Sequence, residues 1–195
     1  MTRARKQASS STGSIRIIGG SHRGRKLPVL NAEGLRPTTD RTKETLFNWL
    51  MMDVSGAHCL DCFAGAGSLG FEALSRGADV VNLMELDKQA ARQLTANAEL
   101  LKYSSEEACV IQGNTLDLLK QFSKVVDIVF IDPPFQQNLV QPCINLIESR
   151  ELTKSGTKIY IEREVNADLL QLPAGWRLIK EKSTQQVSAQ LYLVE

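Results

Sequence analysis

From residue 57 onwards, short apolar runs alternate with longer segments in which apolar residues recur every three or four positions. The short runs predict strands and the longer segments predict helices, because side chains alternate across a strand but repeat about every 3.6 residues around a helix. We expect strands near 57–62, 79–85, 108–112, 125–131 and 157–162, and helices near 68–77, 87–101, 114–122 and 139–150. This alternation is typical of an α/β fold with a parallel sheet.

Both ends of the chain depart from this alternation. Pro173-Ala174-Gly175 interrupts it, and two strands near 176–180 and 187–194, joined by a polar turn, predict a closing antiparallel hairpin. Near the start, the segments 16–20 and 26–30 flank a basic stretch and predict a small hairpin with cations at its tip. Residues 38–40 can cap a helix that begins near Arg41 and continues to Leu50.

Charge is distributed unevenly over a chain whose 195 residues suit one main domain. Residues 1–43 carry ten Lys or Arg and two Asp or Glu, a net charge of +8, whereas residues 44–195 carry 13 and 20, a net charge of −7. A basic segment on a mildly acidic body suits contact with phosphates, although a solvated tail would have the same composition. Residues 1–14 lack an amphipathic apolar face, so we expect a disordered basic arm there.

The four cysteines and the absence of an 18-residue apolar stretch favour a reducing cytoplasm and no membrane association. Cys59 and Cys62 form a C-x-x-C motif, but residues three apart in a strand point to opposite faces. Buried free thiols are therefore expected in place of a redox or zinc site. His22 and His58 do not form a ligand set with any acid, so no metal is expected.

A glycine-rich loop follows the first strand of the body. Gly65-Ala66-Gly67-Ser68-Leu69-Gly70 matches the G-x-G-x-x-G fingerprint of dinucleotide-binding proteins, with Glu85 about 20 residues further on. Asp61 discriminates between cofactors, because a carboxylate at the strand tip would repel a pyrophosphate. The same carboxylate would suit the ammonium and sulfonium groups of S-adenosylmethionine, which the glycines would allow close to the backbone.

Polar residues at later strand ends could contact the same cofactor. Glu85 can accept hydrogen bonds from both ribose hydroxyls, a role shared by both cofactor classes. Asn114 could contact the adenine edge or could only cap the following helix. With Gly65 and Asp132, these residues would stand at the carboxyl ends of four consecutive strands, where open α/β sheets bind ligands.

Asp132-Pro133-Pro134-Phe135 places a carboxylate, a rigid backbone and an aromatic ring at one strand terminus. An exocyclic amine of a nucleobase is a poor nucleophile, because its lone pair is delocalised into the ring. Asp132 and the Pro133 carbonyl could draw such an amine towards tetrahedral geometry while Phe135 stacks on the base. The motif alone allows adenine, cytosine and guanine.

In this order and spacing, Asp61-x-Phe63-x-Gly65-x-Gly67, Glu85 and the Asp132–Phe135 motif resemble the class I S-adenosylmethionine-dependent amino-methyltransferases of DNA and RNA. The segments 16–28, 35–41 and 44–50 narrow the resemblance to the bacterial 16S rRNA guanine-N2-methyltransferase (RsmD-like) family, over about residues 15–195. The resemblance implies a Rossmann-like fold with a seven-stranded, mostly parallel sheet in residues 51–195, preceded by a basic RNA-binding extension in 15–50.

The same resemblance implies a reaction and a set of roles. S-adenosylmethionine would methylate the N2 amine of a guanine in 16S rRNA, guanine 966, on an assembling small ribosomal subunit, and we expect a monomer. Asp132, Pro133 and Phe135 would hold the guanine. Residues implied to bind the cofactor are Asp61, Phe63, Gly65, Gly67, Glu85 and Asn114. Residues implied to contact RNA are Arg16, Arg23, Arg25, Lys26, Arg36, Thr38 and Arg41.

Three other functions are open at the level of sequence. A DNA or RNA adenine or cytosine amino-methyltransferase shares the amine-binding motif, but the front end of roughly 40 residues is short for reading bases in a groove. A non-catalytic RNA-binding assembly protein could keep the same body and would lack cofactor affinity. An NAD-dependent oxidoreductase fits the glycines but is opposed by Asp61.

Overall fold

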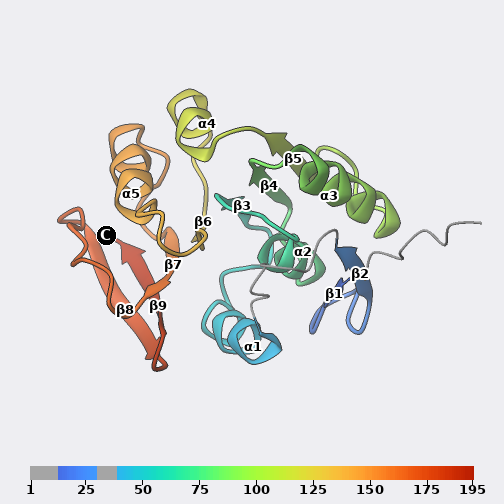
Figure 1. Ribbon diagram of the computed structural model, residues 1–195, viewed down its shortest axis with the longest axis horizontal. Helices are drawn as coiled ribbons and strands as arrows, with labels where there is room; N and C mark the ends of the chain where they lie inside the picture. The colour runs from blue at the N-terminus through green and yellow to red at the C-terminus, as the bar shows by residue number, and fades with distance from the viewer. Residues whose placement is uncertain (1–12, 30–38) are drawn as a thin grey trace, which may run out of the picture.

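A seven-stranded sheet organises the chain in the computed structural model, which describes residues 13–29 and 39–195 (Figure 1). Its strand order is β5-β4-β3-β6-β7-β9-β8. The five strands β3 to β7 all run parallel to one another, whereas β9 runs antiparallel to both β7 and β8. The bounds are β3 His58–Asp61, β4 Val80–Glu85, β5 Ala108–Gln112, β6 Ile128–Ile131, β7 Lys158–Glu164, β8 Trp176–Ser183 and β9 Val187–Val194. The expected Rossmann-like sheet with a closing antiparallel hairpin is confirmed.

Helices cover both faces of this sheet (Figure 1). One apolar cluster joins the sheet to α1 Asp40–Trp49, α2 Ser68–Ser75 and α3 Lys88–Leu100, and a second joins its other face to α4 Thr115–Gln121 and α5 Val140–Ser149. Successive side chains of β6 point to opposite faces of the sheet, which explains why there are two clusters. Phe130 packs in the first cluster and Ile131 in the second. Both side chains are fully buried, as expected for a central strand of a parallel sheet.

A separate two-stranded hairpin packs against the first helical layer. β1 Gly13–Arg16 pairs antiparallel with β2 Lys26–Val29, and the segment 17–25 connects them. The prediction of a first strand at 16–20 is therefore wrong, and β1 also begins inside the segment expected to be a disordered arm. The reason is tertiary: the Ile18 amide donates to the buried Glu72 carboxylate (2.8 Å), so residues after Ile17 bond to α2 instead of extending the strand.

Charged groups hold this hairpin against α1 and α2. Glu72 has no exposed surface and also accepts a hydrogen bond from Arg76 (2.7 Å). The ammonium of Lys43, 1% exposed, donates to the Arg16 carbonyl. Burial lowers the pKa of Lys43, while the charges of Glu72 and Asp40 raise it. These contacts fix the hairpin to the body from the side opposite α4 and α5.

All four cysteines are free thiols, and three are buried. Cys59 packs in the cluster beneath α1 to α3 and Cys62 in the cluster beneath α4 and α5. Burial raises the pKa of both thiols. The expectation that the C-x-x-C motif points its two thiols to opposite faces is confirmed. Within residues 13–29 and 39–195, no helix is long and apolar enough to cross a membrane.

Candidate functional site

The strand order reverses between β3 and β6, which are neighbours in the sheet. From β3 the chain moves outward through β4 and β5, and it then returns to build β6 and β7 on the other side. Open α/β sheets bind ligands at the carboxyl edge beside such a switch point. The loop 62–67 after β3 and the loop that begins at Asp132 after β6 both start at this point.

Asp61 is the last residue of β3 and is 1% exposed. Its Oδ1 atom has no hydrogen-bond partner among residues 13–29 and 39–195. Burial raises the pKa of this carboxyl to about 7, the nearby amides of Phe63 and Gly70 lower it, and the charge of Glu85 raises it. A buried carboxylate oxygen without a partner is unfavourable unless a cation or a donor satisfies it. Asp61 therefore fits a ligand that brings positive charge to the switch point.

Gly65 and Glu85 meet beside Asp61. The Gly65 amide donates to Glu85 Oε2 (2.8 Å), and the Asp87 amide donates to Oε1 (2.7 Å). Each carboxylate oxygen keeps a second lone pair, so Glu85 can still accept two hydroxyl groups. Gly65 has a φ of +53°, and a Cβ there would have the Phe63 carbonyl at 4.0 Å as its nearest neighbour. The backbone at Gly65 therefore leaves room for a ligand.

Gly67 and Asn114 have structural tasks that the structure shows directly. Gly67 precedes α2 with a φ of +81°, and a Cβ there would lie 2.4 Å from the Phe71 ring and 2.7 Å from Leu94. Asn114 caps α4, because its side chain accepts from the amides of Leu116 (3.0 Å) and Asp117 (3.3 Å). Contact of Asn114 with an adenine ring stays a prediction.

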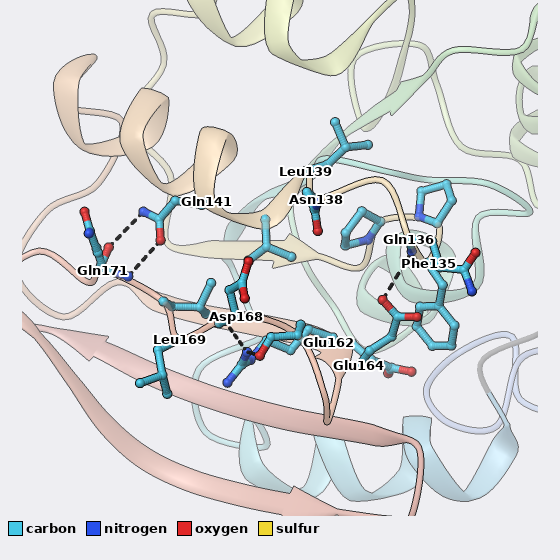
Figure 2. A pocket seen from close by; sticks show the side chains of 16 residues that line it. Phe135, Gln136, Asn138, Leu139, Gln141, Glu162, Glu164, Asp168, Leu169 and Gln171 are labelled. Atoms are coloured by element: carbon cyan, nitrogen blue, oxygen red, sulfur yellow. Dashed lines mark hydrogen bonds between the residues drawn. The ribbon is translucent and has the colours of Figure 1, made fainter.

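A cavity of about 340 Å³ opens next to the Asp132 motif (Figure 2). Pro133, Pro134 and Phe135 line one side, and the start of α5 continues that wall. The opposite wall comes from the end of β7 and from residues 167–171. The buried Pro133 and the half-buried Phe135 thus present a rigid backbone and a ring to a cavity of nucleobase size.

Hydrogen bonds join the two walls of this cavity. Gln141 of α5 donates to the Gln171 carbonyl (2.9 Å) and accepts from the Gln171 amide (2.7 Å), as Figure 2 shows. At the other end of the cavity, the Gln136 amide donates to Glu164 Oε2 (3.2 Å). The two walls of the cavity are therefore joined at two points, one at α5 and one at the motif loop.

The acids of β7 are functional candidates that sequence reasoning missed. Glu162 and Glu164 both line the cavity, and Glu162 is 8% exposed and accepts from the Tyr160 hydroxyl (2.7 Å). Ile131 of β6 pairs with Ile161 of β7, so Asp132 lies level with Glu162. The available signal was the pair of acids spaced two apart at the end of an apolar strand.

The hairpin cations are exposed but do not lie beside Asp132. Arg16, Arg23, Arg25 and Lys26 are all exposed, as is Arg41 at the start of α1. The hairpin tip docks on the last residue of α2, because the Ser21 amide donates to the Ser75 carbonyl (2.7 Å). Since α2 begins at the carboxyl edge of the sheet, its end and the tip lie towards the opposite edge. Arg36 and Thr38 lie outside the described residues.

The part of the chain that the structure describes contains no group of three or more His, Cys, Asp or Glu side chains suited to a metal ion. The side chains that converge at the switch point are instead carboxylates, prolines and an aromatic ring. This set suits an organic cation and a flat base.

Comparisons with known proteins agree with this geometry. The model of the family described as Conserved hypothetical protein 95 matches residues 15–193. A Haemophilus influenzae protein named ribosomal RNA small subunit methyltransferase D is 53% identical over 188 residues, which are 95% of this chain and 97% of the relative. The protein of the same name from Escherichia coli K12 is 48% identical over 183 residues, covering 94% and 91%.

Solved structures extend the similarity to three dimensions. The Escherichia coli protein yhhF, described as a methyltransferase, matches with a TM-score of 0.86 at 45% identity, covering 94% of this chain and 99% of that one. A Haemophilus influenzae protein described as a methylase matches with a TM-score of 0.79 at 48% identity, covering 93% and 99%. The chain therefore belongs to the family of these relatives, the ribosomal RNA small subunit methyltransferase D family that its motifs resemble.

Proposed function

We propose that this protein transfers a methyl group from S-adenosylmethionine to the N2 amine of a guanine in the RNA of the small ribosomal subunit, guanine 966 by family resemblance. The observation that carries the proposal is the position of Asp132-Pro133-Pro134-Phe135, beside the Asp61 and Gly65 loop at the switch point. The names of the relatives support ribosomal RNA as the substrate.

The chain offers matching partners for the positively charged methionine end and for the ribose of the cofactor. The unpartnered Oδ1 of Asp61 would meet the positive charge of the methionine end. Glu85 would accept the ribose hydroxyls, and Gly65 would let the ligand approach the backbone. When bound, S-adenosylmethionine supplies a methyl group made electrophilic by the adjoining sulfonium.

Asp132 and the Pro133 carbonyl would hold the guanine amine. Their hydrogen bonds would localise the nitrogen lone pair, and Phe135 would stack on the ring inside the cavity. In an in-line transfer, the new nitrogen–carbon bond forms as the sulfur–carbon bond breaks, and the carboxylate of Asp132 would take the proton that the amine loses. Most of the acceleration would come from orientation and electrostatics.

The test uses purified protein, S-adenosylmethionine with a labelled methyl group, and small ribosomal particles from cells that lack this protein. We expect labelled N2-methylguanosine after nuclease digestion and mass spectrometry. Asp132→Ala should lower kcat by roughly 100- to 1,000-fold, because it removes a group that acts on the reacting amine.

Asp117→Ala is the matched control, since Asp117 lies on α4 with a side chain 66% exposed, and it should keep full activity. Label on an adenine or a cytosine would contradict the assignment of the base. A protein with no calorimetric affinity for S-adenosylmethionine would favour a non-catalytic assembly role instead.

A further inference from the structure

We propose that Glu164 selects guanine by accepting a hydrogen bond from the N1–H group beside the N2 amine. This inference rests on the proposed function, and it assigns the choice of base to a residue outside the Asp132–Phe135 motif. Glu164 is the last residue of β7 and lines the same cavity as Pro133 and Phe135.

The carboxylate of Glu164 is oriented towards the motif loop. Its Oε2 atom accepts from the Gln136 amide (3.2 Å), one residue after Phe135, as Figure 2 shows. Gln136 makes this contact with a φ of +61°, a conformation that is costly for a residue with a side chain. In the described part of the chain, Oε1 of Glu164 has no hydrogen bond and no ion pair, so it remains an acceptor for a ligand.

The register of the sheet relates Glu164 to Asp132. Asp132 is level with Glu162, and Glu164 is two residues further towards the carboxyl edge on the adjacent strand. Residues two apart on a strand point to the same face, so Glu162 and Glu164 lie on one side of β7. Two acceptors at this spacing can meet two adjacent donors on one edge of a base. The N2 amine would face Asp132, and N1–H would face Glu164.

Neighbouring charged side chains are engaged elsewhere. Glu162 accepts from the Tyr160 hydroxyl and is nearly buried. Arg163 donates to the carbonyls of Ala167 (3.2 Å) and Asp168 (2.8 Å), so its guanidinium fixes the segment that forms the far wall. Of the two acids of β7 that line the cavity, Glu164 is the more exposed and the one bonded to the motif loop.

The chemistry of the bases makes this acceptor selective. In guanine, the ring atom N1 next to the amine carries a hydrogen and is a donor. The corresponding atoms are N1 in adenine, next to the N6 amine, and N3 in cytosine, next to the N4 amine, and both are acceptors. A carboxylate at this position would bond to guanine and repel the other two bases, because two acceptors cannot share a hydrogen bond. An acceptor left unpaired in a cavity strongly disfavours binding.

The experiment compares two substrates whose N1 atoms differ in hydrogen bonding, a donor in one and an acceptor in the other. Small ribosomal particles are assembled with RNA carrying either guanine or 2-aminopurine at the methylated position. 2-Aminopurine keeps the amine at C2, but it has an acceptor at N1 and lacks the oxygen at C6. The missing oxygen is common to every variant, so the change in substrate preference between wild type and Glu164→Gln reports on N1. We expect the wild-type protein to favour guanine by roughly 10- to 100-fold in kcat/KM. In Glu164→Gln, whose amide can donate to N1 of 2-aminopurine, this ratio should fall to about threefold or less.

Glu148→Gln on α5 is the matched control, because Glu148 is exposed and does not line the cavity, and it should keep the wild-type ratio. An unchanged ratio in Glu164→Gln, with wild-type affinity for S-adenosylmethionine, would overturn the role of Glu164 and leave the proposed function standing. A wild-type protein that methylates neither particle would overturn both. The ratio also separates selection from folding, since a partly unfolded variant would lose activity on both substrates equally.

Discussion

At the scale of single residues, Asp61 has the environment that most constrains what binds. It is almost wholly buried, and one oxygen lacks a partner among the residues described. Burial is the main reason that its pKa lies near 7 instead of near 4. In the ligand-free protein, Asp61 is therefore largely protonated in mildly acidic solution, and a bound cation would favour the ionised form.

This raised pKa predicts a pH dependence of both stability and binding. Between about pH 4 and pH 7, the folded protein holds a proton that the unfolded chain has lost, so the contribution of Asp61 to the free energy of unfolding falls as pH rises. Affinity for S-adenosylmethionine should rise about tenfold from pH 6 to pH 8, because ionised Asp61 attracts the cation. Calorimetric titration in buffers of different ionisation enthalpy would also count the released proton.

Asp61→Asn should remove both effects, and Asp79→Asn, at an exposed position before β4, should keep them. An affinity that does not change with pH and a titration without proton release would contradict the role of Asp61.

At the scale of elements, the connection from β3 to α2 is held by glycines with different tasks. Gly65 is open to a ligand, whereas Gly67 brings the loop against Phe71 and Leu94. Gly65 therefore meets a requirement of ligand binding and Gly67 a requirement of packing, so substitutions at the two positions should have different effects.

Gly67→Ala should lower the free energy of unfolding for two reasons. The backbone at this position is left-handed, and the new methyl group would overlap the packed side chains of Phe71 and Leu94. A left-handed residue with a side chain costs about 1–2 kcal/mol, and forcing a methyl group into packed side chains adds roughly 1–3 kcal/mol. Gly24→Ala is the matched control, because Gly24 has a similar φ of +85° and no atom within 4 Å of the position that the new methyl group would take. Urea denaturation should show a clearly larger loss of the free energy of unfolding for Gly67→Ala. Equal losses would show that packing at Gly67 is unimportant.

Local patterns predicted the elements but not the contacts made between distant ones. The strands and helices of the body lie within a few residues of the expected bounds, because burial on both faces and caps such as Asn114 are local signals. β7 continues past Ile161 to Glu164 because it pairs with β9, where Glu164 faces Val187. That long-range pairing places Glu164 in the cavity, whereas the local sequence shows only a pair of acids at the end of an apolar strand. The first strand of the N-terminal hairpin departs from its predicted bounds for a similar reason, since the Ile18 amide bonds to Glu72, 54 residues away.

At the scale of the whole molecule, the basic hairpin and the proposed catalytic edge are separate. The tip rests on the end of α2, while Asp132 and Glu85 stand at the opposite edge of the sheet. The tip would therefore hold RNA at a distance from the methylated base. Phosphate contacts give affinity without reading sequence. The hairpin would therefore contribute to RNA affinity, while the residues at the opposite edge of the sheet would select the base.

Replacing Arg23, Arg25 and Lys26 with alanine together should weaken RNA binding without changing the chemical step. Each lost phosphate contact should flatten the dependence of log affinity on log salt by about 0.7–0.9. The value of kcat at saturating substrate should stay at the wild-type level. Binding measured at several salt concentrations, with single-turnover methylation, checks both expectations.

The control replaces the exposed cations Lys120, Lys124 and Arg150, which lie beside α4 and α5, away from the hairpin. It should leave the salt dependence unchanged. If both triple variants gave the wild-type slope, the hairpin would have no role in phosphate binding.

The most direct measurement is a map of methyl groups on small-subunit ribosomal RNA from cells that lack this protein. We predict the loss of one N2-methylguanine, by family resemblance at guanine 966, and of no other methyl group. Wild-type protein should restore it, Asp117→Ala should also restore it, and Asp132→Ala should not. A complete methylation pattern in cells that lack the protein would contradict the proposed methylation of small-subunit ribosomal RNA by this protein.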